Sequence, residues 1–177
     1  MIKINSADIP CQVYISNVND HDNIKHTFLN LIDKFPILSI KVSKENNLQK
    51  IYNTDYFLSN KFNRFNYDFL IPVIESHNLA LSTFLQYAHQ IKTNHIWYQQ
   101  YKKGDYHSWH RHSDVFSNIY YVDLPENSSK TSFRFRGKEF EVDVEEGQIL
   151  TFPSFLEHCS KPNLSKKIKT VISFNSN

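Results

Sequence analysis

The sequence predicts a segregated α+β fold, in which helices come first and a jelly-roll-like set of strands follows. Apolar residues recur at helical spacing in the first half of the chain, as far as His89, and at a spacing of two after Asn94. Seven short alternating segments, separated by turn residues, are typical of a sandwich or barrel-like jelly roll. Helices followed by strands in this order indicate the α+β class.

The 177 residues contain no internal repeat, Pro-rich linker or low-complexity tract, so we expect a single domain over residues 1–177. Residues 1–92 are expected to form mainly helical support, and residues 93–177 a β core that carries the functional site. Lys and Arg number 20 against 18 Asp and Glu, which leaves a net charge of +2. This balance argues against an electrostatic nucleic-acid partner.

The cysteines, the amino terminus and the apolar runs of the sequence indicate the cellular compartment. Cys11 and Cys159 lie far apart and lack the spacing of a metal site, so a reducing compartment is the simplest interpretation. The amino terminus lacks the apolar stretch of a secretory signal. The longest apolar runs, such as Phe69–Ile74, are too short to span a bilayer. We therefore expect a cytoplasmic protein without a membrane partner.

Two helices are expected in the first half. The first covers Asn19–Phe35, where Asn19 or Asp20 can cap the start and Pro36 ends the helix. Its apolar residues at helical spacing are Ile24, Phe28, Leu31, Ile32 and Phe35. A short extended piece is expected at 37–42. The second helix lies within Tyr67–His89, with Pro72 in its first turn or at a kink. Its core candidates are Phe69, Leu70, Val73, Leu81, Phe84, Leu85 and Ala88.

Seven strands are expected in the second half, where apolar and polar residues alternate. Phe140, Val142 and Val144, for example, alternate with acidic residues. Turns are expected at Arg136–Lys138 and at Glu145–Gly147, each of which contains a glycine. The predicted strands are Ile96–Tyr101, Tyr106–His112, Ser117–Leu124, Ser132–Arg136, Glu139–Val144, Gln148–Phe152 and Lys169–Asn175.

The densest polar segment is Tyr106–Asp114, which reads YHSWHRHSD. Because residues i and i+2 of a strand share a face, His110 and His112 point the same way, and Asp114 joins them if the strand continues. His107 is expected on the opposite face. Two imidazoles on one face can bind a single metal ion, whose third ligand must come from elsewhere.

His158 is the best candidate for that third ligand, because it follows the predicted strand Gln148–Phe152, which could pair nearby. Open positions on such an ion would bind oxygen and a substrate, as non-haem iron sites require. Two histidines at this spacing are a weak signal by themselves in a chain with nine histidines. The surrounding pattern makes the signal specific.

Further motif elements occur in a fixed order around these histidines. Tyr101 precedes Gly104 by three residues, His110 by nine and His112 by eleven. The later elements are Ser117–Val122 (SNIYYV), Glu146–Gly147, Ile149–Pro153 (ILTFP), His158 and Lys169–Asn175 (KTVISFN). Over about Ile96–Asn175, this arrangement resembles the 2-oxoglutarate- and Fe(II)-dependent dioxygenases, in particular prolyl-hydroxylase-like members of the phage-type branch.

The resemblance implies a double-stranded β-helix with the N-terminal helices packed on one sheet. It also implies a catalytic Fe(II) ion held by His110, His112 and His158. The family has a carboxylate where this chain has His112, so a neutral ligand leaves the site one negative charge short. In one alternative, His112 and Asp114 form the first pair and Asp114 is a ligand, although the Tyr101–Gly104 spacing favours His110 and His112. In another, the site has lost the chemistry and keeps only a binding pocket.

The resemblance further implies that 2-oxoglutarate binds beside the metal. In this family a cation at the position of Lys169 holds the distal carboxylate of 2-oxoglutarate, and Ser173 shares the strand face of Lys169. Tyr101 and Tyr121 match positions where the family places phenols near the cosubstrate. The candidates to line a water-poor cavity are Trp97, Trp109 and Phe155.

The implied activity is that of a 2-oxoglutarate-dependent non-haem iron dioxygenase that uses O2, with ascorbate as reductant. It would hydroxylate an unidentified substrate and release succinate and CO2, in the cytoplasm or in a host cytoplasm if a phage encodes the chain. Two alternatives stay open: a cupin-like module that binds a metal or ligand without turnover, and a three-histidine dioxygenase that does not use 2-oxoglutarate. The second alternative corresponds to a thiol dioxygenase. Lys169 argues against it, because a thiol dioxygenase needs no cation to hold a cosubstrate carboxylate.

Overall fold

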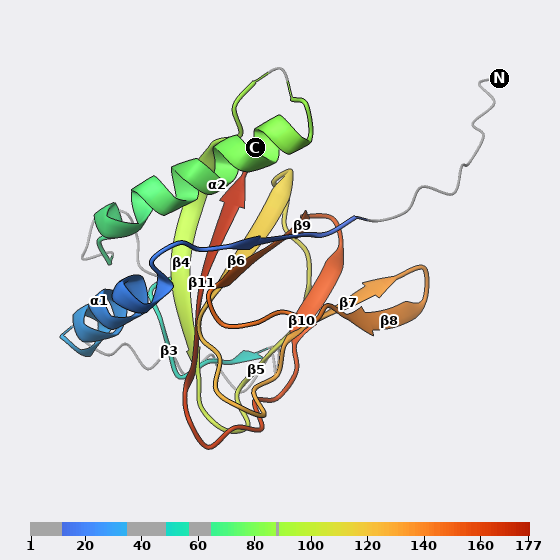
Figure 1. Ribbon diagram of the computed structural model, residues 1–177. Coiled ribbons are helices and arrows are strands. Elements are labelled where there is room, and N and C mark those ends of the chain that lie inside the picture. Colours follow the sequence, from blue (N-terminus) through green and yellow to red (C-terminus); the bar gives the residue numbers. More distant parts are fainter. Residues whose placement is uncertain (1–11, 35–48, 57–64, 88) are drawn as a thin grey trace.

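The structure is a computed structural model that describes residues 12–34, 49–56, 65–87 and 89–177. Two antiparallel β-sheets pack against each other, and two α-helices accompany them (Figure 1). This architecture agrees with the predicted α+β class. None of the described helices is long and apolar enough to cross a membrane.

Fourteen elements make up the described chain. In order they are β1 (Tyr14–Asn17), α1 (His21–Asp33), β2 (Gln49–Lys50), β3 (Asn53–Thr54), a 3₁₀ turn (Asp68–Leu70), α2 (Ile71–Phe84), β4 (Thr93–Tyr101), β5 (Tyr106–His110), β6 (Phe116–Asp123), β7 (Thr131–Phe135), β8 (Lys138–Glu141), β9 (Gln148–Pro153), β10 (Glu157–Ser160) and β11 (Lys169–Ser176). The six-stranded sheet has the order β1-β9-β6-β11-β4-β3, and the five-stranded sheet has the order β2-β5-β10-β7-β8.

All seven predicted strands are present, with ends that differ by at most three residues. The sequence pattern misses β1, β2, β3 and β10. Strands β2 and β3 have two residues each, too few to display an alternating period. Within the described part of residues 1–92, three short strands accompany the two helices: β1, β2 and β3 extend the two sheets by pairing with β9, β5 and β4.

The two predicted turns form as expected. The first joins β7 to β8 and places Phe135 opposite Lys138. Arg136 and Gly137 have positive φ angles of 50° and 75°, as a two-residue type I′ turn requires. The second turn leads into β9 and ends at Gly147, whose φ is 86°.

Strand β11 lies in the middle of the six-stranded sheet, between β6 and β4, and its two faces differ. Ile172 and Phe174 belong to a hydrophobic cluster that includes residues of both helices. Lys169, Val171 and Ser173 line a cavity between the sheets. Because side chains alternate along a strand, burial of one face against the helices directs the other face into this cavity.

A second hydrophobic cluster fills the space between the two sheets. Phe133 of β7 and Phe152 of β9 meet edge to face there, with ring centroids 4.9 Å apart. Both side chains are completely buried. This contact joins the five-stranded sheet to the six-stranded sheet at one side of the cavity.

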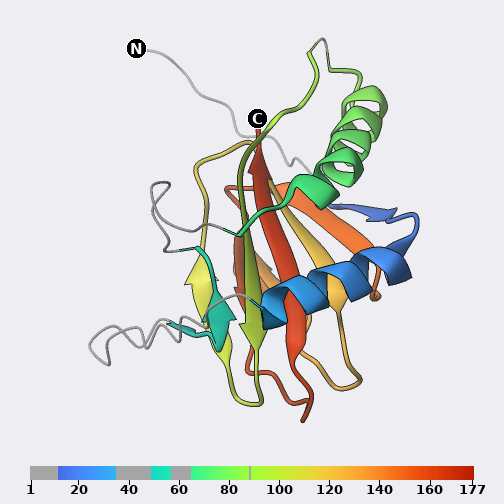
Figure 2. The ribbon, with the colours of Figure 1, turned by 90° about the vertical axis from the view of Figure 1, so that its left-hand side faces the viewer.

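Helix α1 packs on the outer face of the six-stranded sheet, as Figure 2 shows. Ile24, Phe28 and Ile32 are buried and share one helix face because they are four residues apart. The Phe28 ring is completely buried, and its centroid is 5.9 Å from that of Tyr98 in β4. Ile74 of α2 belongs to the same cluster.

The ends of the helices differ from the sequence prediction. Asp20 is the N-cap of α1, but its side chain accepts a hydrogen bond from Asn23 Nδ2 and does not cap the backbone. Helix α2 ends at Phe84, five residues before His89. Phe84, a predicted core residue, is 71% exposed at the end of the helix, and Gln86, two residues later, takes a left-handed conformation.

Other helix predictions have mixed outcomes. Pro72 lies in the first turn of α2, where its missing N–H group has no intrahelical partner to lose. Leu31 keeps the helical spacing but is 39% exposed. Phe35, Pro36, Ala88 and the extended piece at 37–42 lie outside the described residues.

Candidate metal centre

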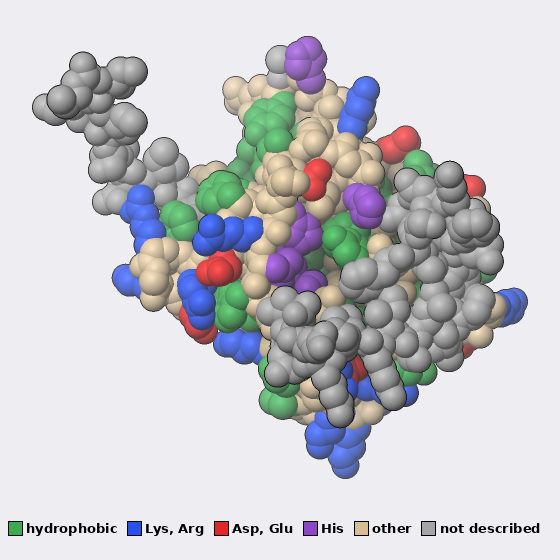
Figure 3. All heavy atoms as spheres, turned by 180° about the vertical axis from the view of Figure 1, so that it is seen from behind, with side chains coloured by type: hydrophobic (Ala, Val, Ile, Leu, Met, Phe, Trp, Pro, Cys, Tyr) green, Lys and Arg blue, Asp and Glu red, His purple; other side chains and the backbone are tan. Residues whose placement is uncertain are grey.

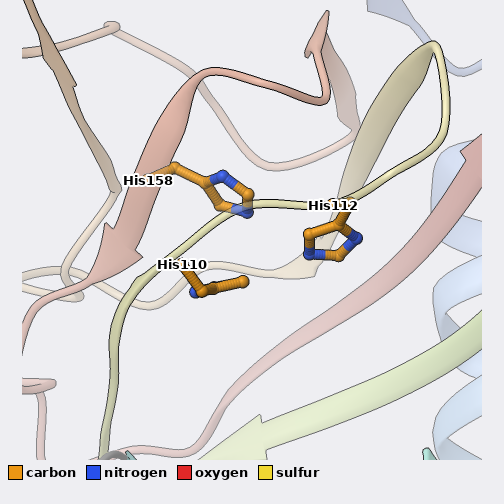
Figure 4. A group of neighbouring side chains, drawn as sticks. All are labelled: His110, His112 and His158. Atoms are coloured by element: carbon orange, nitrogen blue, oxygen red, sulfur yellow. The ribbon is translucent and has the colours of Figure 1, made fainter.

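Three histidines from neighbouring segments meet between the sheets. His110 ends β5, and His158 lies opposite it on the paired strand β10. His112 follows two residues after the end of β5. One nitrogen from each ring lies within 4.8 Å of the others, and Figure 4 shows the three rings around a common space. The predicted ligands are thus brought together, with His158 on a strand that the sequence pattern did not reveal.

The hydrogen bonds behind two of these rings determine which nitrogen is free. His110 Nδ1 lies 2.7 Å from the carbonyl oxygen of Ser108, and His158 Nδ1 lies 2.9 Å from that of Leu156. A carbonyl oxygen only accepts, so Nδ1 carries the hydrogen and donates in both rings. Each neutral ring then offers an unprotonated Nε2, the form that binds a metal ion.

Burial keeps the three rings neutral. Desolvation lowers the pKa of His110 to about 4 and that of His158 to about 3. It also lowers the pKa of His112. Near neutral pH the three imidazoles are therefore in the protonation state that a metal ion requires.

His107 belongs to the same site, which corrects the expectation that it faces away. Its ring stacks on that of His110, with centroids 3.9 Å apart and an interplanar angle of 20°. The register of β5 explains this: β10 pairs His158 with His110 but Ser160 with His107, so β5 contains one extra residue, a β-bulge. The bulge turns His107 into the cavity, where burial and the neighbouring histidines lower its pKa to about 2. No glycine or proline marks the bulge in the sequence.

Asp114, the alternative ligand, lies outside this group of three rings. Strand parity no longer orients Asp114, because β5 ends at His110. Its carboxylate accepts hydrogen bonds from Asn94 Nδ2 at 3.1 Å and from Asn175 Nδ2 at 2.8 Å. This arrangement favours His112 over Asp114 as the third ligand.

Lys169 brings a buried positive charge to the cavity. The residue is 3% exposed, and its Nζ donates to the Ser129 carbonyl oxygen at 3.0 Å and to Ser160 Oγ at 2.7 Å. Nζ also lies 4.5 Å from the centroid of the Tyr101 ring. Within the described part of the chain no carboxylate forms an ion pair with it, and burial lowers the pKa of Lys169 to about 7.

The other predicted cosubstrate residues line the same cavity. Ser173, Tyr101 and Tyr121 all contribute to its wall. The Tyr121 hydroxyl forms a hydrogen bond of 2.7 Å with Thr131 Oγ1, and burial raises the pKa of Tyr121 to about 12. Asn175, which was not predicted, lies two residues after Ser173 on the strand face that Lys169 and Ser173 share, so strand parity could have identified it.

A wider cleft of about 740 Å³ leads from the histidines to the surface, where histidine side chains gather near the middle of the face in Figure 3. Trp97 lines both cavities, and its ring stacks 5.8 Å from that of His112. Trp109 lies in neither cavity, since its ring packs against the Arg134 guanidinium, 4.3 Å away. Phe155 is 61% exposed and lines a separate surface groove.

The residues present fit an iron site that takes an anionic cosubstrate. Three neutral imidazole nitrogens suit Fe(II), as they also suit zinc, copper and nickel. Lys169 supplies a cation in the same cavity, and its surroundings provide only neutral oxygen atoms among the described residues. A ligand with one metal-chelating end and one carboxylate end would satisfy both features.

Comparison by sequence finds no matching family model and no matching curated protein. Solved structures do match. A viral collagen prolyl hydroxylase from Paramecium bursaria Chlorella virus-1, in complex with 2-oxoglutarate, has a TM-score of 0.65 and 12% identity over 93% of this chain and 94% of that one. A Pseudomonas putida prolyl-4-hydroxylase has a TM-score of 0.66 and 10% identity over 94% and 92%.

A third neighbour is a prolyl hydroxylase from Trichoplax adhaerens, in complex with a peptide fragment of hypoxia inducible factor. Its TM-score is 0.64 and its identity 14%, over 93% of this chain and 82% of that one. Identities this low establish a shared fold, and the predicted resemblance is confirmed at that level. The chain has the fold of the prolyl hydroxylases and related 2-oxoglutarate- and Fe(II)-dependent oxygenases.

Proposed function

We propose that the protein is an Fe(II)- and 2-oxoglutarate-dependent dioxygenase that hydroxylates a C–H bond of its substrate and releases succinate and CO2. One observation carries the proposal: a single cavity holds three convergent neutral histidines and a buried lysine without a carboxylate partner among the described residues. The shared fold with prolyl hydroxylases supports it.

The chain would bind and orient the reactants. His110, His112 and His158 would hold Fe(II) through Nε2, and the bound iron would supply the oxidation chemistry with O2. The Lys169 ammonium would pair with the distal carboxylate of 2-oxoglutarate, with Ser173 as an additional hydrogen-bond donor. The apolar side chains between the sheets would keep water away from the reacting groups.

The wider cleft beside Trp97 would admit the substrate that is oxidised, while 2-oxoglutarate would occupy the inner cavity. Three of the solved neighbours are prolyl hydroxylases, and one of them is bound to a peptide. A peptide that contains proline is therefore the first substrate to test, with residues 1–177 acting as a single oxygenase domain.

The cosubstrate site can be tested spectroscopically without knowledge of the substrate. Anaerobic protein loaded with Fe(II) should develop the weak visible charge-transfer band of the chelate on titration with 2-oxoglutarate, and this band should saturate. His158→Ala should bind no iron and show no band. Lys169→Ala should keep the iron but need much more 2-oxoglutarate, and Lys169→Arg is the matched control that keeps the charge. An unchanged titration in Lys169→Ala would contradict the cosubstrate assignment.

Turnover separates the proposal from its alternatives. In air, with Fe(II), ascorbate and 2-oxoglutarate, the protein should release succinate slowly even without its substrate. Iron binding without the band would instead favour a binding module or a three-histidine dioxygenase that does not use 2-oxoglutarate. If the protein bound no iron, the proposed activity would be contradicted, and only the fold shared with the oxygenases would remain.

A further inference from the structure

Asn175 connects the carboxylate of Asp114 to the ring of His112. Its Nδ2 donates to Asp114 Oδ2 at 2.8 Å, and its Oδ1 lies 3.1 Å from His112 Nδ1. Ser117 Oγ donates to the same Oδ1 at 3.3 Å. Asn175 is 7% exposed, so these polar contacts are largely shielded from water and are stronger for it.

The orientation of this amide decides which nitrogen of His112 is free. Nδ1 of His112 lies 3.1 Å from Asn175 Oδ1 and 2.9 Å from Asn175 Nδ2. If Oδ1 accepts, Nδ1 carries the hydrogen and Nε2 is open to a metal ion. If Nδ2 donates, the hydrogen lies on Nε2 and blocks it.

Asp114 fixes the orientation of this amide group. The carboxylate accepts one of the two Nδ2 hydrogens at 2.8 Å, which holds Oδ1 at 3.1 Å from His112 Nδ1, where it can accept the Nδ1 hydrogen. The lone pairs of Oδ1 then remain for Ser117 and for the Nδ1 hydrogen of His112. The opposite amide orientation would place Oδ1 against the carboxylate, which is repulsive.

We propose that Asn175 and Asp114 are positioning residues that fix His112 as an Nε2 ligand. Asn175 does for His112 what the main-chain carbonyls of Ser108 and Leu156 do for the other two rings. The three histidine ligands carry no negative charge. The Asp114 carboxylate provides one nearby: it polarises the Asn175 amide, which in turn contacts the His112 ring. This inference rests on the proposed metal site.

We call the hydrogen-bonded chain from Asp114 through Asn175 to His112 the relay. Its effect can be measured as the dissociation constant of Co(II), a metal ion that tolerates air, in competition with a chelator. Asn175→Ala should weaken Co(II) binding by about tenfold to a hundredfold, as loss of a partner behind a ligand typically does. Asp114→Asn keeps the shape and removes the charge, and should also weaken binding. The double variant Asp114→Asn/Asn175→Asp exchanges amide and carboxylate, and should restore the affinity of the wild type.

The matched control is Asn177→Ala. Asn177 Oδ1 accepts from the Val115 backbone N–H at 2.8 Å and so tethers the same loop without touching His112. Its loss should leave Co(II) affinity within about twofold of the wild type. Equal losses in Asn175→Ala and Asn177→Ala would overturn the relay, because loop tethering would then account for both.

The tautomer of His112 gives a readout that needs no metal. In metal-free protein labelled with ¹⁵N-histidine, long-range ¹H–¹⁵N NMR should place the His112 hydrogen on Nδ1, and Asn175→Ala should shift it toward Nε2. A hydrogen on Nε2 in the wild type would overturn the relay, whatever the metal affinity. Failure of wild-type protein to bind Co(II) would instead overturn the proposed metal site, and this outcome is distinguishable because the tautomer is measured separately.

Discussion

At the scale of single residues, burial gives Lys169 its chemistry. The side chain is 3% exposed, and its ammonium contacts a main-chain carbonyl, hydroxyl groups and an aromatic ring. These neutral partners compensate desolvation only partly, so the pKa falls to about 7. An anionic ligand in this cavity would therefore offset the free-energy cost of burying the Lys169 ammonium, which the ligand-free protein does not offset.

We expect the affinity for 2-oxoglutarate to fall as the pH rises above 7. Free Lys169 loses its proton with a pKa of about 7, whereas a bound carboxylate favours the ammonium and raises that pKa. Binding above pH 7 therefore takes up a proton, and the Kd should increase by up to about tenfold per pH unit. Titrations of Fe(II)-loaded protein under nitrogen, from about pH 6 to about pH 9, measure this slope.

Lys169→Arg is the control for that slope. A guanidinium stays protonated over the whole range, so the Kd of this variant should not vary with pH, even if its absolute affinity is lower. A wild-type Kd that is equal at both ends of the range would contradict the assignment of Lys169.

At the scale of secondary structure, strands β5 and β10 separate what the sequence can predict from what it cannot. Parity places Lys169 and Ser173 on one face of β11, but it does not account for His112, because β5 ends at His110 and His112 follows the strand. It misplaces His107, because a β-bulge changes the parity of β5 without a residue type that signals it. Strand β10 has four residues and no clear alternation, so its pairing with β5 becomes visible only in three dimensions.

Helix α1 depends on one buried aromatic ring. Phe28 is completely buried against the rings of Phe65, Phe69 and Tyr98. Phe28→Ala should lower the free energy of unfolding by about 3 to 5 kcal/mol, measured by urea denaturation. Leu31→Ala, on the exposed side of the same helix, should change it by only about 0.5 kcal/mol. Similar losses in the two variants would mean that α1 does not pack as described.

At the scale of the whole molecule, the candidate site joins the two sheets. His110 and His158 come from the five-stranded sheet, whereas Lys169 comes from the six-stranded sheet. A metal ion alone would engage the first sheet and the His112 loop. A cosubstrate that is bound to both the metal and Lys169 would tie the sheets together across the cavity.

Hydrogen exchange should reveal these two steps separately. Co(II) alone should slow exchange in β5, β10 and residues 111–115, because its ligands lie there. Adding 2-oxoglutarate should extend the protection to β11 near Lys169 and to the segment around Ser129, and should raise Tm further. In Lys169→Ala the first step should persist and the second should disappear. Equal protection of β11 by 2-oxoglutarate in that variant, or in metal-free protein, would mean that the anion binds elsewhere and does not bridge the sheets.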